Sequence, residues 1–293
     1  MWKARLCLII TALIWGSTFI AQRLVADTIS PAGYTAVRFA LGTLTMVPLL
    51  LFMKDSTPPK LPKLPLYVAS SLLAFFLFMG SALQQYSLMY TTAGKAAFIT
   101  GLYIVWVPIA GLFVGQRLNI LSIFGIIIAV VGADFMTLQD GAFTIAWADI
   151  VLLISTFFWV AHILLLNIFS KQYPAFKLAT TQFLACAILA FVLAQFISPI
   201  TIDEISNSWF AILWGGSLSV AIGFTGQLLG QRYVPPTQAS LLMSLEMVFA
   251  AVIGFLVLGE TMNTNEIYGV IAISIGVVLA QLPSPWSIPP IRR

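Results

Sequence analysis

Apolar runs of about twenty residues follow one another along almost the whole sequence, and an α-helix needs about that length to cross the hydrocarbon core of a membrane. The composition agrees, because 60% of the 293 residues are hydrophobic, only 8% are charged, and the mean hydropathy is +1.01. The strands of a membrane barrel would alternate in short segments, whereas these runs are continuous. The sequence therefore predicts an all-α polytopic membrane protein.

Ten transmembrane helices can be placed on these runs. Lys3 and Arg5 precede the first run, but it lacks the small-residue cleavage site of a signal peptide, so we expect the mature protein to keep it. The prolines after residue 283 exclude a further helix, and residues 286–293 are expected to form a cytoplasmic tail. The predicted spans are roughly 5–22, 33–53, 66–90, 94–115, 120–138, 148–169, 177–197, 208–231, 236–258 and 266–282.

The second half of the sequence repeats the first. The match is clearest around residues 82–108, where a run ends in amides and tyrosines, turns, and begins the next run. Four separate parts of each half agree at nearly one offset, 143 or 144 residues, which predicts two five-helix repeats at 1–140 and 146–285. The matching pairs are Gln84 with Gln227, Tyr90 with Tyr233, Ala96 with Ala239, Trp15 with Trp159, Phe39 with Phe183, Gly125 with Gly269, and Gly132 with Gly276.

The two repeats are predicted to be inverted, because five is odd and the second copy must begin on the opposite side of the membrane. Loop charges support this arrangement: with a cytoplasmic N-terminus, eleven basic residues lie on the cytoplasmic side and two, Arg23 and Lys95, lie outside. Both termini are then cytoplasmic in a cell (inner or plasma) membrane. The eleven are Lys3, Arg5, Lys54, Lys60, Lys63, Arg117, Lys171, Lys177, Arg232, Arg292 and Arg293, and the acidic residues expected outside are Asp27, Asp140, Asp149, Asp203, Glu204, Glu260 and Glu266.

Short motifs in this order and spacing resemble those of the drug/metabolite transporter (DMT) superfamily, in the form built from two EamA domains. They are Trp15-Gly16-Ser17-Thr18-Phe19, Arg38-Phe39, Ala93-Gly94-Lys95-Ala96-Ala97-Phe98, Ser244-Leu245-Glu246 and Leu258-Gly259-Glu260. The resemblance implies a transporter of amino acids, nucleotide-like metabolites or drugs, with its path between the halves along spans 1, 3, 4, 6, 8 and 9. Met247 stands where the family often has proline, and Gln116 replaces a glutamate at the end of span 4.

Two titratable residues lie inside predicted spans and are candidates for ion coupling. Glu246 lies near mid-membrane, where a carboxylate must be paired, protonated or in contact with water. His162, the only histidine, lies past the middle of its span, and an imidazole has the proton affinity that a relay requires. The alternative for each residue is a structural hydrogen bond to a neighbouring helix.

An aromatic and amide set forms the candidate solute-binding site. Tyr103 and Trp106 are three residues apart and share one helical face. A cavity with aromatic walls and a few amides suits an amphipathic metabolite; the alternative is a lipid-facing belt of tryptophan and tyrosine at the membrane surface. The full set is Trp15, Gln84, Gln85, Tyr86, Tyr103, Trp106, Trp159 and Gln227.

Two basic residues at the outer ends of spans have alternative interpretations. Lys95 is a further substrate-binding candidate, because an ammonium group attracts a carboxylate, although its side chain can also extend to the membrane surface. Arg38 is interpreted as structural, through extension to the surface or a bond to a helix-end carbonyl.

The sequence contains no Gly-x-x-x-x-Gly-Lys-[Ser/Thr] phosphate loop, no His-Glu-x-x-His metal motif and no large basic patch for nucleic acid. We therefore expect no cofactor or metal, and a monomer whose partners are a small-molecule solute and the lipid bilayer. Two inverted repeats with polar residues inside the spans favour a secondary transporter, with export of small amphipathic metabolites such as amino acids by alternating access. The alternative is a membrane-embedded lipid or envelope enzyme or its accessory subunit, which the short outer loops disfavour.

Overall fold

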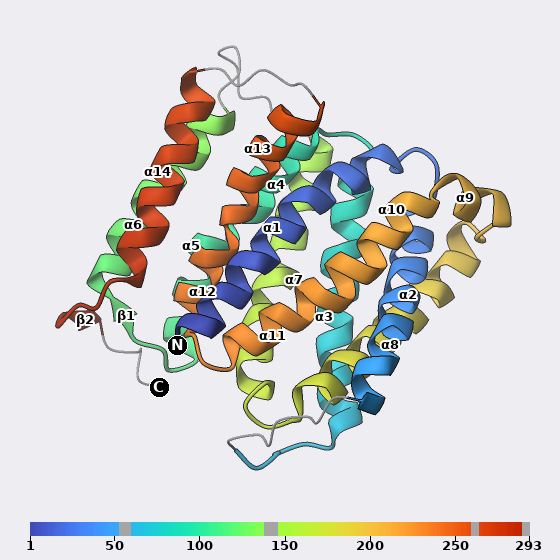
Figure 1. The fold of residues 1–293 in the computed structure, drawn as a ribbon, viewed down its shortest axis with the longest axis horizontal. Coiled ribbons are helices and arrows are strands. Elements are labelled where there is room, and N and C mark those ends of the chain that lie inside the picture. Colours follow the sequence, from blue (N-terminus) through green and yellow to red (C-terminus); the bar gives the residue numbers. More distant parts are fainter. Residues whose placement is uncertain (53–59, 138–145, 259–263, 289–293) are drawn as a thin grey trace.

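The computed structural model describes residues 1–52, 60–137, 146–258 and 264–288, and the chain there is almost entirely helical (Figure 1). The first half contains α1 (Trp2–Leu24), α2 (Pro31–Phe52), α3 (Leu66–Ser87), α4 (Ala93–Gly101), α5 (Tyr103–Phe113) and α6 (Ile120–Thr137). The second contains α7 (Trp147–Phe169), α8 (Ala175–Ile197), α9 (Ile202–Asn207), α10 (Trp209–Leu213), the π-helix η1 (Trp214–Phe224), α11 (Thr225–Gln231), α12 (Pro236–Met243), α13 (Leu245–Leu258) and α14 (Thr264–Gln281).

Nine helical segments of the described chain are long and apolar enough to cross a membrane. The tenth predicted span corresponds to α6, whose apolar part, Ile120–Phe135, is shorter. The prediction of an all-helical polytopic membrane protein is confirmed. The predicted boundary at residue 140, the Gly259-Glu260 motif, and Lys54, Asp140, Arg292 and Arg293 lie outside the described residues.

Three spans that the sequence predicted as single helices are interrupted. Span 4 breaks at Leu102, between α4 and α5, and span 9 breaks at Ser244, between α12 and α13. At these breaks Leu102 N–H donates to Ile99 O and Met247 N–H donates to Ser244 O, which are tighter three-residue turns. Span 8 widens instead into η1 between α10 and α11. Where a helix is broken, the backbone and side-chain groups at the break can face the interior of the molecule.

The helices pack in a pattern that is unchanged when the two halves are exchanged. Equivalent spans meet directly, because α6 packs on α14 and α2 packs on α8. The other contacts occur in matched pairs, such as α3 on α7 and α11 on α1. Helices α6 and α14 run in opposite directions (Figure 1), and the strands next to them, β1 (Leu118–Asn119) and β2 (Ser287–Ile288), pair antiparallel. The halves are therefore interleaved as inverted repeats.

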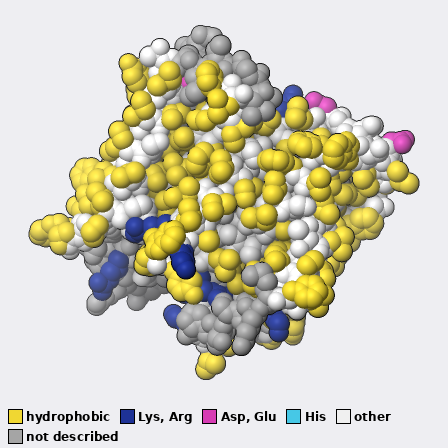
Figure 2. Space-filling view, in the orientation of Figure 1, with side chains coloured by type: hydrophobic (Ala, Val, Ile, Leu, Met, Phe, Trp, Pro, Cys, Tyr) yellow, Lys and Arg dark blue, Asp and Glu magenta, His cyan; other side chains and the backbone are white. Residues whose placement is uncertain are grey.

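Glycines permit close approach where these helices cross. A Cβ at Gly125 would collide with the carbonyl oxygen of Gly276, and a Cβ at Gly276 would collide with that of Gly125. This mutual contact lets the α6 and α14 backbones touch, as small residues do in membrane helix pairs. Figure 2 shows hydrophobic side chains covering the flanks of the helices, with most of the visible Lys and Arg gathered at the end where the N-terminus and β2 lie.

Candidate functional site

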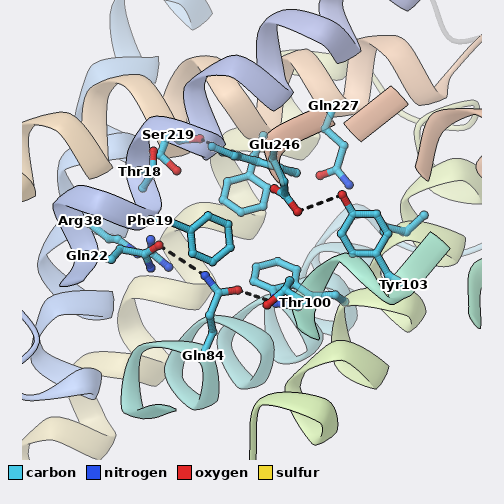
Figure 3. A pocket seen from close by; sticks show the side chains of 14 residues that line it. Thr18, Phe19, Gln22, Arg38, Gln84, Thr100, Tyr103, Ser219, Gln227 and Glu246 are labelled. Atoms are coloured by element: carbon cyan, nitrogen blue, oxygen red, sulfur yellow. Dashed lines mark hydrogen bonds between the residues drawn. The ribbon is translucent and has the colours of Figure 1, made fainter. Parts of the chain in front are cut away.

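A cavity lies in the interior of the helical bundle, between the two halves (Figure 3). The space free of protein atoms amounts to about 480 Å³, including the part that opens to solvent. Both halves contribute to the wall, so any relative movement of the halves would reshape the cavity. The lining residues are Trp15, Thr18, Phe19, Gln22, Arg38, Gln84, Thr100, Tyr103, Trp159, Ile163, Ser219, Phe224, Gln227 and Glu246.

Six of the residues predicted from the sequence line this cavity. Five were predicted to bind solute and one, Glu246, to couple an ion. They come from helices far apart in the chain, and the fold brings them together in one space. The five solute candidates are Trp15, Gln84, Tyr103, Trp159 and Gln227.

Glu246 accepts a hydrogen bond from Tyr103 Oη at 3.0 Å, and each residue is only 3% exposed. The two positions are 143 residues apart, which is the repeat offset, so the bond joins equivalent points of the two halves. Each residue lies in the first turn of the helix that follows a break, α5 or α13. In the first turn of α13 the helix dipole favours a negative charge over a positive one, which suits a carboxyl group at this position. The helix breaks thus place a phenol–carboxylate pair at the centre of the molecule.

Hydrogen bonds through amide side chains join Trp159 and Gln84, which line the cavity, to α1. Trp159 Nε1 donates to Gln84 Oε1 at 3.0 Å, and Gln84 Nε2 donates to Gln22 Oε1 at 3.3 Å. Gln85 is fully buried but lies outside the cavity lining, and its Nε2 donates to the Gln22 carbonyl oxygen at 3.1 Å. Gln85 therefore holds α1 against α3, while Gln84 faces the cavity.

Arg38 lines the cavity and is 3% exposed, in contrast to the surface extension considered for it from the sequence. Its guanidinium carbon lies 5.2 Å from the ring centroids of both Tyr34 and Phe39, within cation–π range. In the described part of the chain no carboxylate forms a salt bridge with Arg38. The sequence could have indicated this position, because Arg38 lies within an apolar run and has no acidic residue one helical turn away to pair with.

Four cavity-lining residues each carry a buried polar atom without a hydrogen-bond partner in the described protein: Gln22 Nε2, Arg38 Nε, Thr100 Oγ1 and Gln227 Oε1. Buried polar groups are nearly always hydrogen-bonded, so each such exception calls for an explanation. Donors and acceptors that face a shared cavity can be satisfied by a polar solute or by water. The cavity therefore has the chemistry of a binding site for a polar or zwitterionic molecule within aromatic walls.

Four other predicted residues lie outside the lining of this cavity. His162 is fully buried, bonds through Nε2 to Gln182 Oε1 at 3.2 Å, and packs edge-on to Trp159 and Phe224. Tyr86 contacts the ring of Tyr90. Trp106 packs on Phe157, which is 46% exposed, so the two rings lie toward the outer surface of the bundle.

Lys95, the remaining candidate, forms a salt bridge at the N-terminal end of α4. Its Nζ lies 2.6 Å from Asp149 Oδ2, and that oxygen also accepts from the Ala146 N–H at the start of α7. Asp149 is 5% exposed and the Lys95 side chain 26%, so the carboxylate end of the bridge is buried while the ammonium end reaches the surface. This contact joins α4 to α7 at one end of the cavity-bearing bundle.

A second set of contacts joins α7 to α11 at the opposite end of α7. Asn167 Nδ2 donates to the Gln231 carbonyl oxygen at 2.6 Å, and Arg232 donates to the Ser170 and Tyr173 carbonyl oxygens at 2.6 and 2.7 Å. Lys171, just beyond the end of α7, donates to Asn167 Oδ1 at 3.0 Å, and partial burial together with Lys60 lowers the pKa of its ammonium group. These contacts hold α7 against α11, two helices of the second half, on that side.

Within the described ranges no group of three or more His, Cys, Asp or Glu side chains lies close enough to hold a metal ion. The fold and site therefore define a multi-pass membrane protein whose two inverted repeats enclose a polar and aromatic cavity. Such a cavity at a repeat interface is the arrangement found in secondary transporters.

The comparisons with known proteins agree with this class. The profile of the EamA-like transporter family matches residues 2–138 and 146–282, and the chain belongs to this family, which is part of the DMT superfamily. An uncharacterized transporter of Archaeoglobus fulgidus is 30% identical over 95% of this chain and 86% of its own length. A WAT1-related protein of Arabidopsis thaliana is 24% identical over 88% of this chain and 80% of its own length.

A solved structure is similar in fold. It is a crystal structure of a protein 17% identical in sequence, with a TM-score of 0.78 over 95% of this chain and 96% of the other. Together, the family match and the membrane spans make this chain a membrane transporter.

Proposed function

We propose that this transporter is a secondary carrier of small amphipathic metabolites, amino acids in particular, that works by alternating access and performs no enzymatic reaction. The observation that carries the proposal is the cavity between the repeats, in which charged, amide and aromatic side chains from both halves face one space. Export is the direction expected from the family resemblance. The solute would bind in the cavity while the halves rock around it.

The contacts at the two ends of α7 support the alternation. At one end the Lys95–Asp149 salt bridge joins α4 to α7, and at the other Asn167 and Arg232 join α7 to α11. Opening between α4 and α7 would break the first set, which joins the two halves, and opening between α7 and α11 would break the second set, which lies within the second half. Because the cavity lies between them, opening one set at a time would expose the solute to one side at a time.

The orientation we propose places both termini in the cytoplasm of a cell membrane. Eleven basic residues against two favour this orientation under the positive-inside rule. In Figure 2 most of the visible Lys and Arg side chains gather around the N-terminal end, one lies at the opposite end, and the visible acidic side chains lie toward that opposite end. The Asn167 contacts would then lie on the cytoplasmic side and the Lys95 salt bridge outside.

Glu246 is the residue that we propose couples transport to protons. It is buried, it lines the cavity, and it is hydrogen-bonded to Tyr103 across the repeat. A carboxylate in such a place is either neutralised by a proton or stabilised by a bound cation or water. His162 lies behind the wall formed by Trp159 and Phe224, so we assign it a secondary part in the coupling.

The test is uptake of a labelled amino-acid and nucleoside panel into proteoliposomes, with and without an imposed pH gradient. We expect saturable flux that responds to the gradient in the wild type, and Glu246→Gln should abolish the response while exchange continues. His162→Gln is the matched control, because it removes the other titratable candidate and should retain most of the response. An unchanged pH response in Glu246→Gln would overturn the coupling role. The absence of any flux would favour the enzyme or accessory-subunit alternative.

A further inference from the structure

We propose that Arg38 and Gln22 form a subsite for the carboxylate of a zwitterionic solute, an α-amino acid with an apolar or aromatic side chain, whose ammonium group faces Glu246. This inference rests on the proposed carrier function and adds the way in which the solute is held. It also assigns a binding role to a residue that the sequence alone indicated to be structural.

Arg38 has the properties of an anion-binding residue. It is 3% exposed, it lines the cavity, its Nε has no hydrogen-bond partner in the described chain, and no described carboxylate forms a salt bridge with it. A guanidinium group presents donors in a planar fork that matches a carboxylate. The rings of Tyr34 and Phe39 hold the group by cation–π contacts, and Tyr34 also forms a side-chain hydrogen bond with it, so Nε is the donor left without a protein partner.

Gln22 supplies a second donor to the same side of the cavity. Its Oε1 is already occupied, because it accepts from Gln84 Nε2 at 3.3 Å. The acceptor role fixes the amide orientation, so Nε2 is the group left without a protein partner. A donor oriented by its neighbours and left unsatisfied is suited to an incoming anion.

The acidic end of the cavity lies opposite. Figure 3 shows Arg38 and Gln22 on one side, Glu246 and Gln227 on the other, and Phe19 between them. At this end the unpartnered atom is an acceptor, Gln227 Oε1, next to the carboxylate of Glu246. An ammonium group needs acceptors, just as a carboxylate needs donors. The cavity therefore has complementary groups for both ends of a zwitterion.

The backbone positions on α1 beside the two ends are separated by about the length of a short zwitterion with its hydrogen bonds. Gly16 lies against the Glu246 backbone and Gln22 stands six residues further along α1, so these two backbone positions are about 9 Å apart along the helix axis. The ammonium and carboxylate of an α-amino acid are about 3 Å apart, and a hydrogen bond of about 2.8 Å at each end brings the total to about 9 Å. A dicarboxylate would meet Glu246 with like charge, and a simple amine would leave Arg38 unpaired.

Aromatic rings line the space beside this polar axis. Trp159 stacks on Phe224 with centroids 5.9 Å apart and an interplanar angle of 16°, and Trp15 packs on Phe224 at 4.8 Å. An apolar or aromatic solute side chain would contact these rings. Phenylalanine is therefore the probe of choice.

The test compares phenylalanine with two analogues on the wild-type carrier: phenethylamine, which lacks the carboxylate, and 3-phenylpropionate, which lacks the amine. Thermal stabilisation of the purified protein reports binding, and proteoliposome uptake reports transport. We expect phenylalanine to stabilise the protein and to be transported, with each analogue at least about tenfold weaker, as for the loss of one charge-assisted hydrogen bond. Equal behaviour of phenylalanine and phenethylamine would overturn the carboxylate subsite but leave the carrier function standing.

The variants extend this test to the arginine itself. Arg38→Gln should raise the KM for phenylalanine at least about tenfold and reduce the preference over phenethylamine, and Arg38→Lys should restore part of it. Arg23→Gln is the matched control, because Arg23 pairs with the exposed Asp27 away from the cavity. An Arg38→Gln carrier that transports phenylalanine with unchanged KM and selectivity would refute the subsite. If neither phenylalanine nor its analogues bind to or move through the wild type, both this inference and the amino-acid carrier proposed above fail.

Discussion

At Gly16 the packing of α1 on α13 leaves no room for a side chain beside Glu246. A Cβ there would lie 2.7 Å from the Glu246 carbonyl oxygen, 2.9 Å from Ala250 N and 2.9 Å from Phe249 Cβ. Two of these three atoms belong to the backbone of α13 and cannot rotate away. To reach an ordinary contact of 3.4 Å from 2.7 Å, α13 must move away from α1 by about 0.7 Å.

Gly16→Ala is therefore predicted to lower the free energy of unfolding by roughly 1–3 kcal/mol, the usual range for overpacking of a close interface. It should also reduce transport by about tenfold or more, because Glu246 moves with α13 relative to the rest of the cavity. Stability is measured as the temperature at which the detergent-purified protein loses its monodisperse size-exclusion peak, and transport as initial uptake into proteoliposomes.

Gly94→Ala is the matched control for this substitution. Gly94 is also a helical glycine, in α4, but no atom lies within 4 Å of its Cβ position. The alanine there should be tolerated and should stabilise α4 by up to about 1 kcal/mol through helix propensity. If the two variants unfold at the same temperature and transport at the same rate, the close packing of α1 on α13 is wrong.

Three further predictions concern single contacts. Tyr103→Phe removes the hydrogen bond to Glu246, so the variant should remain folded but shift the pH profile of transport. An unchanged pH profile would mean that the Tyr103 hydroxyl takes no part in proton coupling. Lys95→Met leaves the buried Asp149 without its cation and should lower the free energy of unfolding by roughly 1–3 kcal/mol. Adding Asp149→Asn to this variant should recover part of the loss, which thermal melting of the single and double variants measures. Asn167→Ala removes a bond between α7 and α11 and should increase maleimide labelling of a Thr100→Cys reporter from the side of the chain's N-terminus; equal labelling in both backgrounds would mean that this contact does not keep that side closed.

The spans and the repeat could be predicted because both depend on patterns within the chain itself. Twenty-residue apolar runs follow from the thickness of the membrane, and the offset between the halves is visible in residue identities such as Gln84 and Gln227. The same offset relates Tyr103 to Glu246, which the structure joins by a hydrogen bond. The sequence contained this pairing, but only the packing reveals that equivalent positions meet.

The helix breaks and the role of Arg38 could not be predicted in the same way. Both breaks lie inside runs that are apolar enough as a whole to span a membrane, so hydropathy alone does not mark the ends of α4 and α12. Whether Arg38 faces lipid, a carboxylate or a cavity depends on which residues the other helices place beside it. Trp106 illustrates the same limit: helical spacing predicted a common face with Tyr103, but a difference of about 60° around the helix directs it to Phe157 instead.

The central claim is that a solute is carried through the cavity between the repeats, and counterflow tests it most directly. Proteoliposomes are loaded with unlabelled phenylalanine and diluted into a trace of labelled phenylalanine, with no ion gradient. An alternating-access carrier exchanges one for the other, so the label should accumulate transiently above its equilibrium level, and Gly16→Ala should weaken this overshoot while Gly94→Ala preserves it. Label that equilibrates without an overshoot, or that does not enter at all, would contradict the account.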